Sequence, residues 1–138
     1  MFWRFFVSAD ESVDRFIIRD ADSRLNLREK YAIDEWIASG KGVHSMRDHL
    51  NHNYAFNGGM WGAVRTAVPN LVELSKNWDR NVYRADMNLL NEKMYPLVKH
   101  DLFSHDSYHC VKWNATSYPT RRFHLGNQNF FFLYSLTS

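Results

Sequence analysis

Two aspartates, Asp20 and Asp22, stand one residue apart directly after a short apolar run, Phe16-Ile17-Ile18. Residues i and i+2 of an extended chain point to the same side, so this pair could present two carboxylates to one point in space. Two like charges so close repel each other unless a cation lies between them, and Mg²⁺ or Mn²⁺ prefers such oxygen ligands. The spacing therefore indicates a divalent-metal site with room for phosphate oxygens.

The same two aspartates also suit a turn that leads into a helix. Asp22 or Ser23 could accept hydrogen bonds from the first N–H groups of that helix. A three-residue motif often arises by chance, so the pair taken in isolation favours the turn and the cap over the metal. The rest of the chain has to decide between the two interpretations.

The elements that would position these aspartates alternate between strand and helix. A strand buried on both faces is expected over residues 15–18, and a helix is expected from a capping box at Asn26 and Glu29 to a terminating Gly40. Other expected elements are extended segments at 1–7, 54–64, 108–113 and 130–134 and helices at 69–78 and 86–95, the last ended by Pro96. This order predicts a single α/β domain over residues 1–138.

Composition excludes several classes of protein. The 138 residues are 45% hydrophobic, which is ample for a packed core. A net charge of +2, without long blocks of either sign, predicts no nucleic-acid partner. No apolar run is long enough to span a bilayer, and the single cysteine, Cys110, leaves the compartment open.

Four segments in order along the chain resemble the GT-A nucleotide-sugar glycosyltransferases. They are the Asp-x-Asp at 20–22, FNGGM at 56–60, ADMNLLN at 85–91 and WN at 113–114, and the last three are similar to the glycogenin-like retaining branch. A wider set, RDADSRLNLRE, EWIASGK, HSMRDHLNH, GGMWGA and HDSYHC, resembles an uncharacterised group of glycosyltransferase-like proteins. The resemblance covers nearly all of the chain and implies a GT-A-like mixed sheet flanked by helices.

The resemblance also implies a metal site and a donor substrate. Asp20 and Asp22, with His124 as a third ligand, would hold the Mn²⁺ or Mg²⁺ that bridges the diphosphate of a nucleotide sugar. The metal would act as a Lewis acid for the leaving group. The arginines Arg19 and Arg47 would grip the same diphosphate, although salt bridges to Glu29 or Asp48 would explain them equally well.

Further residues are placed around the transferred sugar by the same resemblance. Asn57, Gly58 and Gly59 would contact the sugar. Independently of the resemblance, Trp61 beside three glycines could stack on a sugar ring, although most of the tryptophans are expected to be core residues. Asp86 and Asn88 would be the catalytic residues near the reacting carbon. Two departures from the family pattern accompany these roles, because Met87 and Asn88 stand where the glycogenin-like branch has Gln and Asp.

A larger departure from the family pattern concerns the N-terminal part of the domain. Only 19 residues precede Asp20, whereas a GT-A enzyme usually has a nucleotide-binding half there. The chain is therefore expected to carry the C-terminal part of such a domain, with a truncated sheet edge that a protein partner would cover. Two functions follow from these patterns: transfer of a hexose to an acceptor hydroxyl, or a degenerate, inactive fragment that acts as a structural or interaction subunit.

Histidine clusters raise a competing metal hypothesis. His44, His49 and His52 lie near Asp48, and imidazole and carboxylate are zinc ligands. Their spacing matches no common zinc motif, so surface histidines bonded to their neighbours are the favoured interpretation. The second group, His105-Asp106 and His109, is interpreted in the same way.

Overall fold

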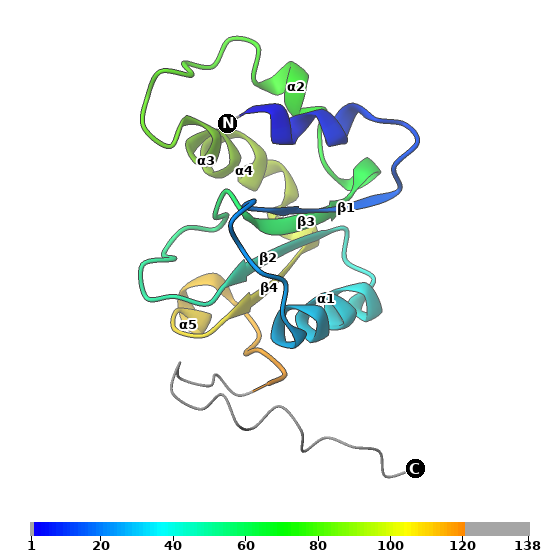
Figure 1. The fold of residues 1–138 in the computed structure, drawn as a ribbon, viewed down its shortest axis with the longest axis vertical. Helices are drawn as coiled ribbons and strands as arrows, with labels where there is room; N and C mark the ends of the chain where they lie inside the picture. Colours follow the sequence, from blue (N-terminus) through cyan, green and yellow to red (C-terminus); the bar gives the residue numbers. More distant parts are fainter. Residues whose placement is uncertain (1, 121–138) are drawn as a thin grey trace.

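A computed structural model describes residues 2–120, which form a four-stranded mixed sheet with helices on both faces (Figure 1). The strands are β1 (Arg15–Arg19), β2 (Val43–Arg47), β3 (Met60–Val64) and β4 (Leu102–Asp106), in the sheet order β1-β3-β2-β4. Strand β3 runs antiparallel to β1 and β2, and β2 is parallel to β4. The carboxyl ends of β1, β2 and β4 therefore lie at one edge of the sheet, and the predicted α/β class is confirmed.

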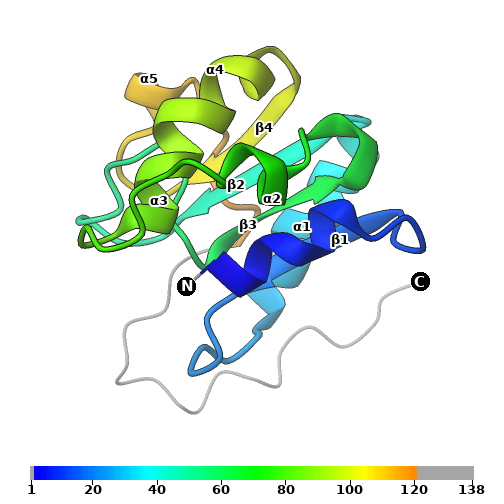
Figure 2. The ribbon, with the colours of Figure 1, turned by 90° about the horizontal axis from the view of Figure 1, so that it is seen from above.

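Short helical segments connect these strands. They are η1 (Phe2–Ala9), α1 (Leu27–Ser39), η2 (Arg65–Ala67), α2 (Leu71–Leu74), α3 (Ala85–Leu89), a π-helical turn η3 (Leu90–Met94), α4 (Tyr95–Val98), η4 (Lys99–Asp101) and α5 (Cys110–Trp113). Seen from above, η1, α2, α3 and α4 lie over the sheet and α1 lies beneath it (Figure 2). None of the helices within residues 2–120 combines the length and the hydrophobicity needed for a bilayer crossing.

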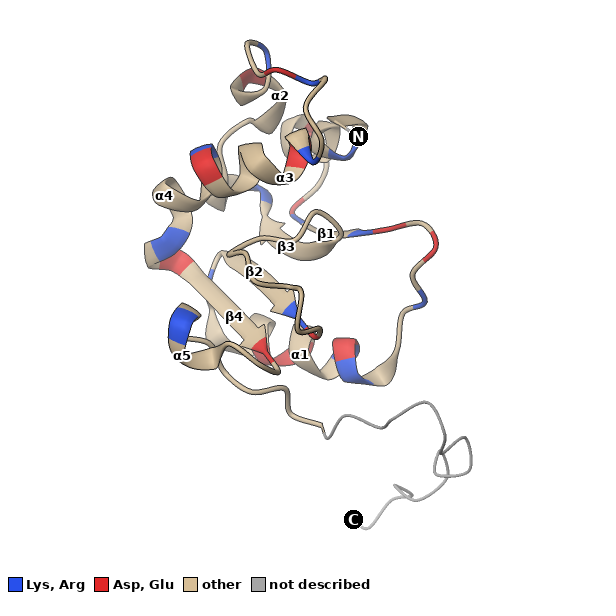
Figure 3. Ribbon diagram, turned by 90° about the vertical axis from the view of Figure 1, so that its left-hand side faces the viewer, with Lys and Arg blue, Asp and Glu red and all other residues tan. Residues whose placement is uncertain are grey.

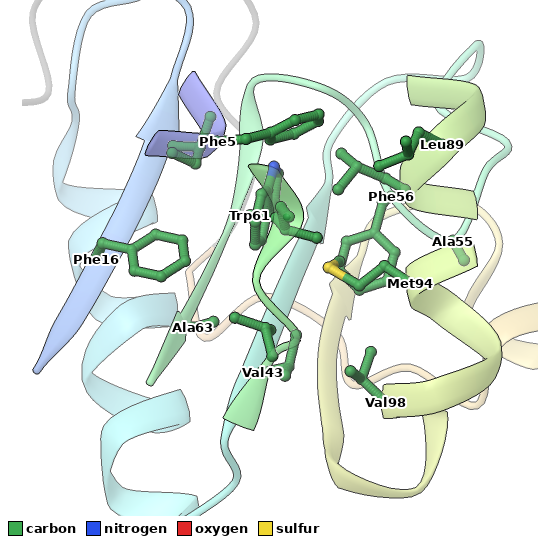
Figure 4. Packing of buried hydrophobic residues seen from close by; sticks show 14 residues of the cluster. Phe5, Phe16, Val43, Ala55, Phe56, Trp61, Ala63, Leu89, Met94 and Val98 are labelled. Carbon is green, nitrogen blue, oxygen red and sulfur yellow. The ribbon is translucent and has the colours of Figure 1, made fainter. Parts of the chain in front are cut away.

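The larger core lies between the sheet and the helices η1, α2, α3 and α4. Trp61 of β3 is fully buried at its centre, with edge-to-face contacts to Phe16 and Phe56 at centroid distances of 5.5 and 5.9 Å (Figure 4). Phe5 of η1 and Met94 of η3 pack into the same cluster. Each fully buried side chain of this size contributes about 1.5–3 kcal/mol, so the cluster is the main source of stability on this face.

The opposite face of the sheet is covered by α1. Trp36 is fully buried and stacks on His44 of β2 with 5.1 Å between ring centroids. Gly62 of β3 makes this possible, because a Cβ there would lie 3.3 Å from the Trp36 ring and 2.7 Å from the Phe16 carbonyl oxygen. The absence of a side chain at Gly62 therefore lets helix α1 pack closely against β3.

Helix α1 begins and ends as its sequence predicts. The Asn26 side chain accepts a hydrogen bond from the Glu29 N–H at 2.9 Å, as in a capping box. The return bond differs from that motif, because the Asn26 side-chain amide, and not its backbone N–H, donates to the Glu29 carboxylate at 3.1 Å. Gly40 ends the helix with φ +71°, a left-handed conformation that favours glycine. Both ends are fixed by contacts over three or four residues, so they can be predicted locally.

Several predicted elements differ from the structure in type, extent or burial, among them the helix expected at 69–78, which is only α2 (Leu71–Leu74). Residues 2–9 are the 3-10 helix η1 rather than an extended segment, and residues 110–113 are α5 rather than a strand. Pro96 lies inside α4, in its first turn, where a missing N–H is tolerated after the π turn. Strand β1 is buried on one face only, because Phe16 and Ile18 are buried while Ile17 is 40% exposed. The strand predicted at 130–134 lies outside the described residues.

Candidate functional site

The two aspartates lie in a turn and not on an extended strand. Strand β1 ends at Arg19, and the Ser23 N–H donates to the Asp20 carbonyl oxygen at 3.0 Å, which closes the turn. Asp22 is exposed at the turn, so the two carboxylates do not share one side of a strand as predicted. The competing cap interpretation is also wrong, because Asn26 and neither Asp22 nor Ser23 caps α1.

Asp20 instead faces a buried arginine that the sequence analysis missed. Arg4 of η1 places Nη2 3.1 Å from Asp20 Oδ1, and its Nη1 donates to the Gly58 carbonyl oxygen at 2.5 Å. The same Nη1 lies 3.8 Å from Asp86 Oδ2 at the start of α3. Figure 3 shows the acidic start of α3 beside η1. Three predicted site residues, Asp20, Gly58 and Asp86, are therefore brought together around one cation.

Gly59 sets the position of the Asp20 carboxylate. A Cβ at Gly59 would lie 2.2 Å from Asp20 Oδ2, so only glycine leaves room for this carboxylate beside the chain that leads into β3. A Cβ at Gly58 would meet Arg4 Nη1 at 3.1 Å and Asp86 Oδ2 at 3.6 Å. The two glycines are needed because charged side chains approach their backbone from both sides.

Arg19 joins this cluster from the end of β1. Its Nη1 donates to the Gly59 carbonyl oxygen at 2.9 Å, and its Nη2 donates to Glu29 Oε1 at 2.7 Å. Burial raises the pKa of the Glu29 carboxyl, and the Arg19 charge and the Asn26 hydrogen bond oppose that shift. The alternative salt bridge of Arg19 to Glu29 is therefore present, and it holds Arg19 beside Gly59.

Asn91 of η3 fixes the segment that carries the glycines. Its Oδ1 accepts from the Phe56 N–H at 3.0 Å, and its Nδ2 donates to the Phe56 and Met87 carbonyl oxygens, both at 2.8 Å. Asn57, predicted to contact a sugar, is buried and donates weakly to the Met46 carbonyl oxygen at 3.5 Å. Asn88, predicted as catalytic, is half-buried on α3.

Two predicted binding residues do not reach this cluster. Trp61 is fully buried in the core, so its ring is not available to stack on a sugar. Arg47 is fully buried and pairs with Asp106, Nε to Oδ2 at 2.5 Å, rather than with a diphosphate. Both corrections have one physical cause, because side chains that alternate along β2 and β3 place Arg47 and Trp61 on the core face of the sheet.

His44 and His105 are buried and paired with each other, so the expectation of surface histidines is wrong for these two residues. His44 Nε2 lies 2.9 Å from His105 Nδ1, and His105 Nε2 lies 2.8 Å from Glu35 Oε2. Burial lowers the pKa of His44 to about 3 and also lowers the pKa of His105, so both rings are neutral near pH 7. Within residues 2–120, no group of three or more potential ligands is placed to hold a metal ion, and His124 lies outside this range.

The oxygen donors near Asp20 fit Mg²⁺ or Mn²⁺ in kind but not in arrangement. Carboxylate and carbonyl oxygens are the preferred ligands of these ions. Asp20 Oδ1 is already paired with Arg4, and Asp22 lies exposed on the turn. A metal held jointly by Asp20 and Asp22 therefore requires a rearrangement of this turn or of Arg4.

Comparisons with family models, with curated proteins and with solved structures gave no match for this chain. The structure itself defines a small α/β domain with a four-stranded mixed sheet. Its most polar cluster of predicted site residues lies at the carboxyl end of β1, the edge where α/β sheets commonly bind ligands.

Proposed function

We propose that this chain is a GT-A-like glycosyltransferase domain that binds a nucleotide-diphosphate sugar and transfers its hexose to an acceptor hydroxyl. The observation that carries the proposal is the convergence of Asp20, Gly58 and Asp86, from three separate segments, at the carboxyl end of β1. These residues belong to three of the four segments on which the family resemblance rests. Asp20 and Asp22 would hold a Mn²⁺ or Mg²⁺ ion only after a rearrangement of their turn or of Arg4, and such an ion would supply a Lewis acid for the departing diphosphate.

The chain's own groups would bind and orient the donor. Asp86 is held by Arg4 at the start of α3, where a carboxylate can accept a hydrogen bond from a sugar hydroxyl. The Arg4 and Asp20 side chains occupy the space that a side chain at Gly58 or Gly59 would fill, so these charged groups lie beside the glycine backbone where the donor would bind. Arg19 adds a guanidinium at the same edge, fixed by Glu29.

The test is calorimetric titration of UDP and GDP into the protein with Mn²⁺, repeated with EDTA. We expect metal-dependent binding that is lost in Asp20→Asn and Asp22→Ala and kept in Asp34→Asn, which changes an exposed surface pair with Lys30. The proposal fails if the folded protein binds neither nucleotide. It also fails if Asp20→Asn binds as the unaltered protein does.

A second candidate function is an interaction subunit without activity, and the free edge of β1 favours it. Within residues 2–120, β1 is paired on one side only, with β3. An open pocket of about 230 Å³ beside this edge is lined by apolar residues that include Trp3 and Ile17, together with Arg4 and Arg19. Trp3 and Phe6 of η1 are 63% and 64% exposed. Such an edge suits a protein partner that adds a strand.

Hydrogen exchange of the β1 amides tests this second candidate. If a protein partner pairs with the free edge of β1, the outward amides of β1 should exchange fast in the isolated chain and be protected in the complex. A monomeric, well-folded protein whose outward β1 amides are already protected would remove this candidate.

A further inference from the structure

The outward edge of β1 carries backbone groups that pair with no other strand within residues 2–120. The Arg65 N–H donates to the Asp14 carbonyl oxygen at 2.9 Å, so the backbone groups of Asp14 face β3. Successive residues of an antiparallel strand direct these groups to opposite sides. The N–H and carbonyl groups that face away from the sheet are therefore those of Arg15, Ile17 and Arg19.

The opposite edge of the sheet, at β4, is already occupied. Thr116 forms a bridge with His105, in which the Thr116 N–H donates to the Ser104 carbonyl oxygen at 2.8 Å. The Thr116 carbonyl oxygen accepts from the Asp106 N–H at 3.0 Å. Among the described residues, β1 is thus the edge that stays open to another strand.

Apolar side chains flank the open edge on both faces of the sheet. Ile17 is partly exposed on the face that α1 covers, and Trp3 of η1 is largely exposed on the other face. Both line the open pocket beside β1, together with Val7. A strand added here would meet apolar surface on each of its two faces, so it should itself be apolar on both.

The sequence contains a segment of this kind after the described residues. Residues 130–134 are Phe-Phe-Phe-Leu-Tyr, which is apolar at every position and typical of a strand buried on both faces. Residues 129–138 carry no charged side chain. A segment so apolar favours burial against the rest of the protein, because its exposure would promote aggregation.

The described part of the chain ends close to the carboxyl end of β1. The Arg28 guanidinium donates to Thr120 Oγ1 at 3.2 Å, and the next residue of α1, Glu29, accepts from Arg19 at 2.7 Å. Residues 121–129 connect Thr120 to the apolar segment, and an extended chain of this length spans up to about 30 Å. The segment can therefore reach the end of β1 and run back along it.

A second copy of the protein fits the same edge less well. Antiparallel pairing of two β1 strands about Ile17 would place Arg15 of one copy opposite Arg19 of the other, and like charges in that position destabilise a sheet. The uncharged segment at 130–134 meets no such repulsion. A segment of the same chain also has a high effective concentration at the edge.

We propose that residues 130–134 form a fifth strand that pairs antiparallel with β1 of the same chain and covers its open edge. The inference does not depend on the glycosyltransferase proposal. It opposes the second candidate function, because a strand from a protein partner could bind β1 only by displacing this segment.

Amide hydrogen exchange of the monomeric full chain tests the inference. The Ile17 amide should exchange about tenfold or more slowly than in the double variant Phe131→Pro with Phe132→Pro, in which two prolines break the added strand in either register. The matched control is Gly126→Pro with Asn127→Pro, which changes the connection before the segment and should leave Ile17 protected. The Phe16 amide, which faces β3, should stay slow in all three proteins.

Three results of this experiment would overturn the inference. One is fast exchange of Ile17 in the unaltered monomer, which would favour a separate protein partner. Another is protection of Ile17 that appears only at concentrations where the protein dimerises, which would favour a second copy. The third is equal protection in the unaltered protein and in the variant Phe131→Pro with Phe132→Pro.

A second measurement needs no variant. Nuclear Overhauser contacts are recorded on the unaltered monomer, and antiparallel pairing predicts contacts between the backbone protons of Ile17 and those of a residue within 130–134. Contacts to Arg15 and Arg19 should then fall on opposite sides of that residue. A spectrum in which residues 130–134 contact another part of the protein, or in which they make no contact with β1, overturns the inference.

Discussion

The carboxylate of Asp20 lies directly against the backbone of Gly59, so that a Cβ on Gly59 would stand 2.2 Å from Oδ2 and 2.3 Å from Cγ. This contact joins the end of β1 to the start of β3, two neighbouring strands that are some forty residues apart in the chain. The candidate site therefore depends on one residue without a side chain.

Gly59→Ala should disturb both stability and binding. The new methyl group would push the Asp20 carboxylate away from Arg4, and overpacking of this kind typically costs about 1–3 kcal/mol. Urea unfolding measures the loss, and nucleotide titration with Mn²⁺ measures the effect on the site. Gly58→Ala is the comparison, because its nearest atom is the end of the Arg4 side chain at 3.1 Å, and it should cost less. Equal stability of Gly59→Ala and the unaltered protein would contradict the packing described.

Asn91→Ala should loosen the segment that carries Gly58 and Gly59. It removes the hydrogen bonds to the N–H and carbonyl of Phe56 in a partly buried setting, where unpaired backbone groups cost about 1–3 kcal/mol. Amide exchange at Phe56 should quicken as the free energy of unfolding falls. Asn70→Ala is the control, since it removes only the exposed cap of α2, and exchange at Phe56 should then stay unchanged.

Arg47→Met should be among the most damaging single substitutions. It leaves the fully buried Asp106 carboxylate without its cation, and breaking a buried pair from one side costs about 3–5 kcal/mol. It also removes the bond from Nη1 to the Ala55 carbonyl oxygen at 2.8 Å. Lys76→Met breaks an exposed pair with Glu73 and should change the free energy of unfolding by less than about 1 kcal/mol. Chemical denaturation measures the free energy of unfolding of both variants. Similar losses in the two would contradict a larger contribution from the buried Arg47–Asp106 pair.

The buried pair of His44 and His105 should make the free energy of unfolding decrease in mildly acidic solution. Burial lowers the pKa of His44 from 6.5 to about 3, helped by the nearby His105 and Arg47, and burial also lowers the pKa of His105 despite its bond to Glu35. The unfolded chain therefore takes up protons first, and the free energy of unfolding should decrease from pH 6.5 toward about 3 as the solution is acidified. The slope reaches up to about 1.4 kcal/mol per pH unit for each imidazole.

Replacing His44 by glutamine should flatten this dependence. Urea unfolding of the two proteins at a series of pH values compares their slopes directly, because glutamine keeps a polar side chain but cannot titrate. The pKa assignment is refuted if both proteins lose stability at the same rate below pH 6.5.

Local contacts explain which parts of the fold could be predicted. The capping box of Asn26 and Glu29 and the left-handed Gly40 depend on neighbours within a few residues, and both are where the sequence places them. The aromatic run at residues 2–9 resembles a strand, but packing of Phe5 against the sheet makes it helical instead. Pro96 is predicted to end a helix, but a π turn precedes it and the helix continues through α4.

The candidate site could be predicted only in part. Sequence motifs predict the site residues Asp20, Gly58, Gly59 and Asp86. The structure brings Asp20 next to Gly59 because β1 and β3 are neighbouring strands. Arg4 was missed because its partners are 16 and 54 residues away along the chain. A charged residue between Trp3 and Phe5 was the available signal, since an arginine in an aromatic run needs an acidic or carbonyl partner once it is buried.

The sheet order has a consequence for how fast the site can form. Strand β3 lies between β1 and β2, so it has to pair with a strand more than forty residues earlier before the sheet is continuous. Strand pairings between residues so far apart in the sequence slow folding. Asp20 contacts Gly59 only once β1 and β3 have paired. The cluster of charged residues around Arg4 therefore cannot form faster than the chain folds.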